Sequence, residues 1–316
     1  MNANLGKTEF TDVEVADLRD RLKAVRDEQQ LTWKQLAAVV GVPEGTISAW
    51  VPGKYLGKDD GIAAKVHRYF LAQDEREELS AELPTVPDFV QTTTARRVLT
   101  ALAVAQQGDM AAVAGVPGLG KTASLIQFKA TRPNVWMTTI RPSNGGVQTM
   151  LLSILRGMGQ ANAKGTPQVL SDTVMGKIRG TRGLLVIDDA QNLSIKAAEE
   201  LRGIHDDTGV GIALVGHLEL ITSLLRPHAQ LYSRFGVKLV QRAPLREDAQ
   251  AIAAAWGVEK GPELTKCIEL GRRQGGLRTL TKTLRNATFL ARREGVPLHL
   301  THINDAAAQG DIEIGA

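Results

Sequence analysis

Residues 115–122 have the composition and spacing of a phosphate-binding loop. They read Gly-Val-Pro-Gly-Leu-Gly-Lys-Thr and fit G-x-x-x-x-G-K-[ST] at every fixed position. Glycines let backbone N–H groups approach phosphate oxygens closely, and a helix that begins there directs its positive end at them. In this pattern Lys121 reaches the β- and γ-phosphates, and Thr122 is a ligand of Mg²⁺. The residues expected to hold the nucleotide are Gly115, Val116, Pro117, Gly118, Leu119, Gly120, Lys121, Thr122 and Ala123.

A second acidic site is expected where the apolar run 184–187 ends in Asp188 and Asp189. In parallel α/β sheets, ligands bind at the carboxyl ends of the strands. Asp188 is therefore predicted to join Thr122 in holding Mg²⁺, and Asp189 to polarise the water that attacks the γ-phosphate. Together with Lys121, these carboxylates predict hydrolysis of a nucleoside triphosphate.

The elements around these motifs alternate between strand-like and helical patterns from about residue 94 to 241. Short apolar runs separated by helical periodicity predict a parallel sheet covered on both faces. After Leu245 only helical patterns remain, and the part before residue 76 has short amphipathic helical patterns. The expected strands are 110–115, 135–140, 184–187, 212–215 and 237–240. The predicted domains are an N-terminal helix-turn-helix domain (1–76), a linker (77–93), an ATPase core (94–242) and a C-terminal helical lid (243–316).

Residues 32–50 fit a helix, a tight turn at Gly41 and a second helix that starts at Pro43. This is the pattern of a helix-turn-helix, whose second helix would present Thr46 and Ser48 to DNA, with Lys54 beyond it for a phosphate. That helix has no Arg, Asn or Gln to read bases, and residues 1–85 hold 11 Lys/Arg against 15 Asp/Glu. A protein-docking module is the alternative.

Composition indicates a cytosolic protein with an anionic partner. No apolar run approaches the ~20 residues that cross a bilayer, the N-terminus lacks a secretion signal, and Cys267 is the single cysteine. The formal net charge is +4, and the positive excess lies after residue 85. Phosphate contacts suffice for sequence-independent binding to double-stranded DNA. The candidate contacts in the core are Arg141, Lys164, Lys177, Arg179 and Lys196.

Three further positions make the chain resemble AAA+ ATPases. His217 follows an apolar strand where that family keeps its first sensor, and Arg234 in Ser-Arg-Phe resembles an arginine finger. Arg278, in Gly-Leu-Arg at the start of a helix, resembles the second-sensor arginine. The resemblance implies a catalytic group of Lys121, Asp188, Asp189, His217, Arg234 and Arg278, with ATP and Mg²⁺ as cofactors.

Within the AAA+ ATPases the chain resembles the transposition ATPases of the Mu B group, from the first helices to about residue 305. The similar stretches are Leu36–Lys54, PDFVQTTT at 87–94, GVPGLGKT at 115–122, NVWMTTI at 134–140 and GGLRTL at 275–280. The resemblance implies a protein that forms ATP-dependent helical filaments on DNA, recruits and stimulates a transposase, and steers insertion away from the element's own DNA. Its expected partners are double-stranded DNA, a transposase and further copies of itself, with no membrane, in the cytoplasm of a bacterial host.

Two positions depart from that family. Asp189 stands where the family usually has Glu, and the shorter side chain predicts slow ATP turnover. His217 stands where the family has Asn, so it is either a sensor or a histidine satisfied at a strand end. Two other functions remain open: a nucleotide-binding DNA adaptor with negligible hydrolysis, and an AAA+ helicase loader or initiator.

Overall fold

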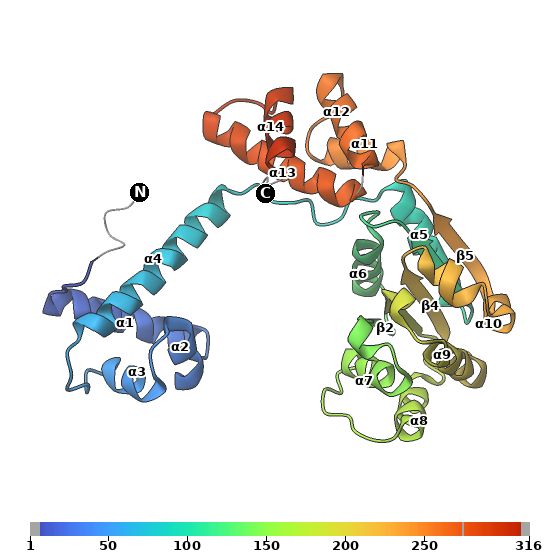
Figure 1. Ribbon diagram of the computed structural model, residues 1–316, viewed down its shortest axis with the longest axis horizontal. Coiled ribbons are helices and arrows are strands. Elements are labelled where there is room, and N and C mark those ends of the chain that lie inside the picture. The colour runs from blue at the N-terminus through green and yellow to red at the C-terminus, as the bar shows by residue number, and fades with distance from the viewer. Residues whose placement is uncertain (1–6, 274, 311–316) are drawn as a thin grey trace, which may run out of the picture. The chain divides into compact units, whose positions relative to one another are not determined.

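The computed structural model describes residues 7–273 and 275–310, which form two compact units. One unit spans Met1–Pro84 and the other Thr85–Ala316. Figure 1 traces the chain from the N-terminal helices to the C-terminal ones. Within the described residues, no helix combines the length and the apolarity that a membrane crossing requires.

From residue 7 onward, the first unit contains four helices packed around Trp50, which is fully buried. The ring nitrogen of Trp50 donates to the carboxylate of Asp59 at 2.8 Å, and Arg19 pairs with the same carboxylate at 3.0 Å. The helices are α1 (Asp12–Glu28), α2 (Trp33–Val40), α3 (Glu44–Trp50) and α4 (Asp60–Glu82).

The turn between α2 and α3 is short because both helices have clear ends. Thr32 caps α2 with a reciprocal hydrogen bond to Gln35, and Gly41 ends it in a left-handed conformation with φ of 73°. Pro43 immediately precedes α3. The order of helix, turn and helix is the one expected, and DNA binding by this pair stays a prediction.

The expected linker at 77–93 is wrong in its first part, because α4 continues through Glu82. The segment Asp74–Glu82 is rich in Glu, Arg, Leu and Ala, which favour helices. The helix therefore ends only before Pro84, where the first unit also ends.

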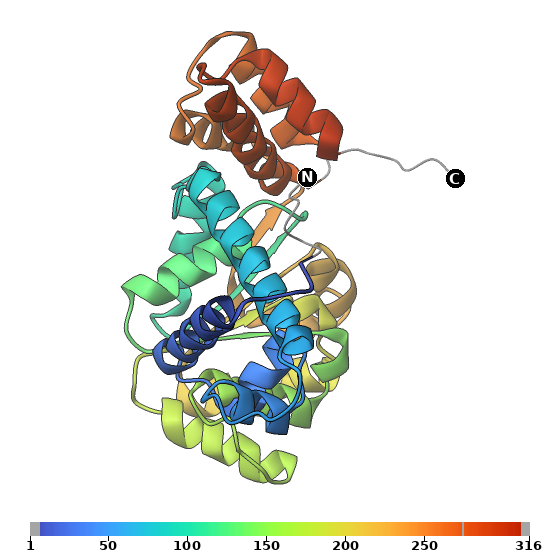
Figure 2. The same ribbon diagram turned by 90° about the vertical axis from the view of Figure 1, so that its left-hand side faces the viewer.

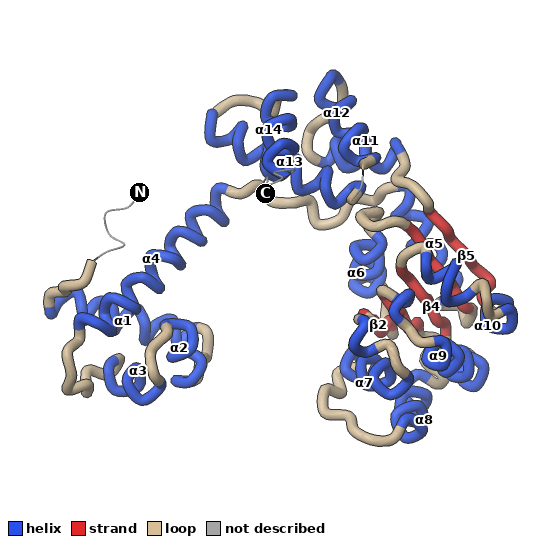
Figure 3. The backbone as a smooth tube through the Cα atoms, in the orientation of Figure 1, coloured by secondary structure: helices blue, strands red, loops and turns tan. Residues whose placement is uncertain are grey.

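The second unit is built on a five-stranded parallel sheet with the order β2-β3-β4-β1-β5. The strands, red in Figure 3, follow the expected runs to within two residues. They are β1 (Met110–Gly115), β2 (Val135–Thr139), β3 (Leu184–Asp188), β4 (Gly211–Gly216) and β5 (Phe235–Gln241). β1, β3 and β4 are buried along their full length, as expected for strands covered on both faces.

Alternate residues of the strands pack against different helices. Val113 and Val186 face one core, which α5 and α6 complete, whereas Leu185 and Ile187 face the other, which α7, α8 and α9 complete. The elements of this layer are α5 (Thr93–Ala105), α6 (Lys121–Thr131), the 3₁₀ turn η1 (Pro142–Asn144), α7 (Val147–Gly157), α8 (Pro167–Ile178), the 3₁₀ turn η2 (Ala190–Asn192), α9 (Ile195–Thr208), the π-helical turn η3 (Leu220–Leu225) and α10 (Ala229–Ser233).

Four C-terminal helices gather beyond one end of the sheet, as Figure 2 shows in orange and red. They are α11 (Arg246–Ala255), α12 (Gly261–Arg272), α13 (Gly276–Glu294) and α14 (Leu300–Gly310), and they share their own apolar core. A buried carboxylate joins them to the sheet layer: Asp248 of α11 accepts hydrogen bonds from the backbone N–H (3.0 Å) and the hydroxyl of Thr94 in α5. Core and lid thus lie in one compact unit, and their division at residues 242 and 243 stays a prediction.

Candidate nucleotide-binding site

A cavity of about 600 Å³ lies where the phosphate loop, β3, β4 and the C-terminal helices meet. Most residues of the expected site line it, including both carboxylates and the two expected sensors. The lining residues from that set are Pro117, Gly118, Leu119, Gly120, Lys121, Thr122, Ala123, Asp188, Asp189, His217 and Arg278. Gly115, which ends β1, and Val116 are the first two residues of the loop and are not among the residues that line the cavity.

Lys121 begins α6 and is held by the loop that precedes it. Its ammonium donates to the carbonyls of Gly115 at 2.8 Å and Val116 at 3.0 Å. Burial lowers the pKa of Lys121, although Asp188 and Asp189 oppose this and Arg278 adds to it. The charge stands at the positive end of a helix, which makes this the most favourable position in the cavity for an anion.

Thr122 and Asp188 form a pair that fits Mg²⁺. The Thr122 hydroxyl donates to Asp188 Oδ2 at 2.9 Å, and Asp188 is only 4% exposed. Burial raises the pKa of Asp188, and the hydrogen bonds from Thr122 and from the backbone of Asp189 oppose it. A hydroxyl and a buried carboxylate are oxygen ligands of the kind that Mg²⁺ prefers, and a bound cation would compensate the buried charge.

Asp189 occupies a strained backbone position directly after β3. Its φ of 52° is left-handed, which is uncommon for residues other than glycine. Its Oδ1 accepts a hydrogen bond of 3.2 Å from the amide of Gln191, whose Oε1 in turn accepts the backbone N–H of His217 at 3.0 Å. The two positions that depart from the family pattern are therefore joined through one side chain that the motifs did not single out.

The C-terminal helices contact the phosphate loop directly. A Cβ on Gly118 would lie 1.8 Å from the backbone oxygen of Gly275, and one on Gly276 would lie 3.2 Å from the oxygen of Gly118. Gly118 and Gly275 also have positive φ values of 79° and 86°. These glycines permit the close approach that brings Arg278, in the first turn of α13, into the cavity.

Several lining residues had no motif to reveal them. The segment 86–90, expected to be linker, lines the cavity, and so do Ile252 and Trp256 of the helical lid. Apolar and aromatic side chains beside a phosphate loop can pack against a nucleobase. The only signal in the sequence is an apolar Phe-Val pair between two prolines and α5, which does not specify a site.

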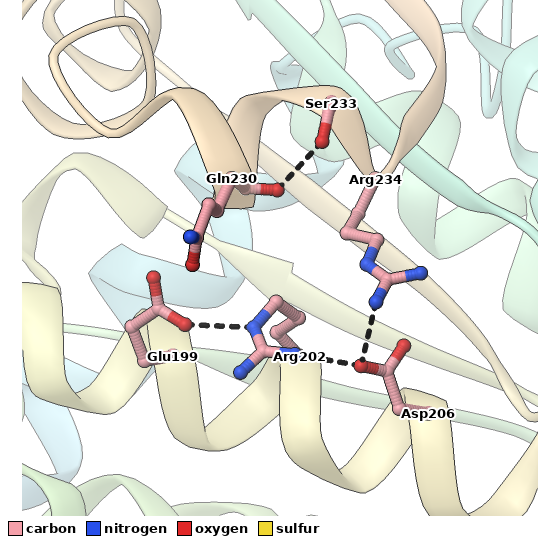
Figure 4. Close-up of polar contacts among 6 residues, drawn as sticks. All are labelled: Glu199, Arg202, Asp206, Gln230, Ser233 and Arg234. Atoms are coloured by element: carbon pink, nitrogen blue, oxygen red, sulfur yellow. Dashed lines mark hydrogen bonds and ion pairs between the residues drawn. The ribbon is translucent and has the colours of Figure 1, made fainter.

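Arg234 lies apart from this cavity. It follows α10 and precedes β5, whose first residue pairs with Met110 and whose last pairs with Gly115. With ~3.3 Å per residue, the length of β5 places Arg234 about 20 Å from its own phosphate loop. Its guanidinium is half exposed and pairs with Asp206 at 3.4 Å (Figure 4).

Asp206 belongs to a short chain of ion pairs along α9. It also pairs with Arg202 at 2.6 Å, and Arg202 pairs with Glu199 at 2.7 Å. In Figure 4 the side chain of Arg234, which follows α10, extends toward Asp206 on α9, and the hydroxyl of Ser233 donates to the carbonyl of Gln230. Arg234, the candidate arginine finger, therefore lies on the surface at the amino edge of the sheet, which is the edge where the parallel strands begin.

The basic residues of the second unit that are expected to contact DNA lie at two opposite edges of the sheet. Arg141 follows β2 and Lys196 follows β3, so both lie near the carboxyl edge of the sheet. Lys164 precedes Gly165, whose carbonyl accepts from Gln148 at the start of α7, which places it on the same side. Lys177 and Arg179 end α8 just before β3, at the amino edge. All five are exposed, but they do not form one surface.

The residues expected to contact DNA in the first unit differ in accessibility. Lys54 is exposed, whereas Thr46 and Ser48 are half-buried. The Ser48 hydroxyl donates to the carbonyl of Gly45 at 3.1 Å within the same helix.

Solved structures similar to this chain share its fold. The Cdc6p structure of Pyrobaculum aerophilum superposes with a TM-score of 0.53 at 16% identity, covering 73% of this chain and 70% of that one. The ORC2 structure of Aeropyrum pernix gives a TM-score of 0.52 at 17% identity, covering 71% and 67%. At these identities the likeness concerns the fold alone.

Sequence comparison is more specific. Residues 104–224 match the AAA domain family, and residues 233–309 match the family described as Mu B transposition protein, C terminal. The ATP-dependent target DNA activator B of Escherichia phage Mu is 29% identical over 306 residues, which cover 95% of this chain and 97% of that protein. The Mu-like prophage FluMu DNA transposition protein B of Haemophilus influenzae is 33% identical over 274 residues, 84% of this chain and 94% of that protein. With a nucleotide-binding AAA domain and this similarity along most of its length, the chain belongs to the Mu B family of DNA transposition proteins.

Proposed function

We propose that this protein is an ATP-dependent activator of target DNA in transposition. It binds double-stranded DNA without strong sequence preference, assembles into helical filaments when ATP and Mg²⁺ are bound, and recruits and activates a transposase. It hydrolyses ATP slowly. The names of the relatives support the ATP dependence and the DNA target, and the arrangement of the site supports the need for assembly.

The observation that carries the proposal is the separation of Arg234 from the cavity. Lys121, Asp188 and Arg278 meet at the carboxyl edge of the sheet, whereas Arg234 is exposed at the amino edge. An arginine finger stabilises the charge that develops on the transferred phosphoryl group. Because Arg234 is about 20 Å from its own phosphate loop, it can serve only the nucleotide of a neighbouring subunit. Hydrolysis then requires assembly.

The remaining roles follow from position. Thr122 and Asp188 hold Mg²⁺, which neutralises charge on the phosphates when bound. Asp189 polarises the attacking water, His217 senses the γ-phosphate, and segment 86–90 with Trp256 packs against the base. Arg141, Lys164 and Lys196 contact DNA phosphates from the carboxyl edge. The first unit assists through α3 or docks a protein.

The test is electron microscopy of the purified protein on random-sequence duplex DNA with ATP, with ADP and without nucleotide. We expect filaments on DNA only with ATP, and the Lys121→Ala variant serves as the control that cannot form them. Binding confined to one defined sequence, with no ordered assembly in any nucleotide state, would contradict the proposal. Measured ATP turnover well below one per minute with DNA present would leave the assembly but identify a nucleotide-binding adaptor.

A further inference from the structure

We propose that Gln191 is a positioning residue for ATP hydrolysis, which orients the carboxylate of Asp189 and joins that orientation to the backbone at His217. This inference rests on the proposed hydrolysis and adds a residue to it. Gln191 lies in the turn η2, immediately after the two carboxylates, and contacts the end of β4.

The hydrogen bonds of Gln191 fix which way its amide points. Gln191 Oε1 accepts the backbone N–H of His217 at 3.0 Å, and its Nε2 donates to Asp189 Oδ1 at 3.2 Å. A backbone N–H only donates and an ionised carboxylate only accepts. Rotating the amide by half a turn would place its NH₂ group against the His217 N–H and its oxygen against the Asp189 carboxylate. Only the observed orientation therefore satisfies both partners.

Gly216 provides the space for this amide. A Cβ at this position would lie 2.2 Å from Gln191 Oε1 and 3.3 Å from the backbone nitrogen of Ala190. The backbone of Gly216 is that of an ordinary strand, without a positive φ. A side chain at Gly216 would therefore displace the Gln191 amide, although the backbone conformation at the end of β4 suits any residue.

The carboxylate of Asp189 is held by a hydrogen bond from Gln191. The side chain of Asp189 is short, and its backbone is left-handed with φ of 52°. Within residues 7–273 and 275–310, Gln191 is the side chain that donates to its carboxylate, through Oδ1, and Oδ2 takes no hydrogen bond. Gln191 thus holds one oxygen while the other stays available to accept from a water in the cavity that Asp189 and His217 line.

The variant Gln191→Leu removes both hydrogen bonds and keeps a similar volume. Because a carboxylate misplaced by ~1 Å costs up to about a hundredfold in rate, we expect kcat for ATP to fall roughly tenfold. KM for ATP should stay within about twofold, because Gln191 does not line the nucleotide cavity. Gln191→Glu keeps an acceptor for the His217 N–H and turns a like charge toward Asp189, so it should lower kcat at least as much.

A double-mutant cycle between Gln191 and Asp189 distinguishes a positioning role of Gln191 from a general structural one, because only a positioning role makes the two losses in kcat non-additive. In an Asp189→Ala background, Gln191→Leu should change the remaining kcat by less than about twofold, because the carboxylate it orients is gone. An equal fold-loss in both backgrounds overturns the inference. If the leucine variant does not fold, as judged by circular dichroism, Gln191→Glu carries the same double-mutant cycle.

Asn192 offers a matched control in the same turn. Its amide donates to the carbonyl of Ile140 at 2.8 Å and not to Asp189. Asn192→Leu should leave kcat within about twofold of the wild type, and a loss as large as that of Gln191→Leu overturns the inference. Wild-type protein that binds ATP without hydrolysing it overturns the proposed hydrolysis together with this role. Wild-type hydrolysis that both Gln191 variants match overturns the role alone.

Discussion

The two edges of the parallel sheet are built in different ways. At the carboxyl edge, Asp188 is buried and Lys121 is held by two backbone carbonyls, within a cavity that the helical lid closes. At the amino edge, Arg234 is half exposed and its ion pair with Asp206 faces solvent. Groups that act on a bound nucleotide must be desolvated and oriented beforehand. The proposed action of Arg234 on a neighbour's nucleotide instead requires a side chain that stays exposed until the neighbour binds.

The largest expected effect tests whether the two edges serve different subunits. Arg234→Ala should lower DNA-stimulated ATP hydrolysis by about a thousandfold, because the charge on the transferred phosphoryl loses its stabilising cation. Nucleotide affinity, measured by fluorescence titration, should change little. Mixing Arg234→Ala with Asp189→Ala subunits, which keep Lys121, Thr122 and Asp188 for nucleotide binding, should restore part of the activity, since each supplies what the other lacks. Mixtures as inactive as their components would place both groups in one subunit's site or in none.

A smaller effect is expected at the carboxyl edge itself. Asp189→Glu should raise steady-state hydrolysis roughly tenfold, because one more methylene brings the carboxylate closer to the attacking water. An unchanged or lower rate would show that chain length at this position does not limit turnover.

The closure of the cavity by the lid can be tested with two glycines of similar backbone. Gly118 and Gly120 have φ values of 79° and 82°, but only a Cβ at Gly118 would meet the backbone of Gly275, whereas one at Gly120 has nothing within 4 Å. Thermal unfolding without nucleotide should show Gly118→Ala less stable than Gly120→Ala by about 1–3 kcal/mol. Equal melting temperatures would mean that the lid does not rest on the phosphate loop.

The smallest expected effect is on the free energy of unfolding, which a change at Asp188 should raise, whereas Gly118→Ala should lower it. Burial raises the pKa of Asp188 above its ordinary value of 3.8. The folded chain therefore holds this proton more tightly than the unfolded chain, and the stability so gained below pH 3.8 is lost as the pH rises through the higher folded pKa. At neutral pH the ionised carboxylate destabilises the fold. Asp188→Asn should raise stability by about 1 kcal/mol while it abolishes hydrolysis.

Asp206→Asn is the matched change at the other edge. Its carboxylate is partly exposed and its ion pairs are screened by solvent, so the loss should stay below about 1 kcal/mol. Scanning calorimetry of both variants at pH 7 distinguishes the two edges. A loss of stability in Asp188→Asn would show that the buried carboxylate supports the fold.

The elements and the phosphate loop could be predicted because their signals are local. Apolar runs separated by helical patterns gave the strands, and the fixed spacing from Gly115 to Thr122 placed the loop at the end of β1. The family resemblance was confirmed by sequence comparison. The end of α4 differs from the predicted boundary at residue 76 because the helix-forming residues of 77–82 continue the helix, and Pro84 lies beyond them.

Contacts between distant residues could not be predicted from local patterns. Gln191 shows no motif, and its role depends on the distance from the end of β4 to the turn after β3. The same holds for Gly118 against Gly275, which lie far apart in sequence and in contact in space. In the sequence, Arg141 and Arg179 are equivalent as candidate phosphate contacts. The direction of the strands places Arg141 at the carboxyl edge of the sheet and Arg179 at the amino edge.

The hydrogen bonds between Thr94 and Asp248 have a consequence for synthesis of the chain. The two residues are 154 positions apart, yet the carboxylate occupies the first turn of α5. At roughly 5–20 residues per second, a ribosome needs about 8–30 seconds after Thr94 before it adds Asp248. During that interval the start of α5 relies on water and on the Thr92 cap. The start of α5 in the nascent chain therefore lacks the Asp248 carboxylate until α11 has been synthesised, and a chain that stops before α11 never acquires it.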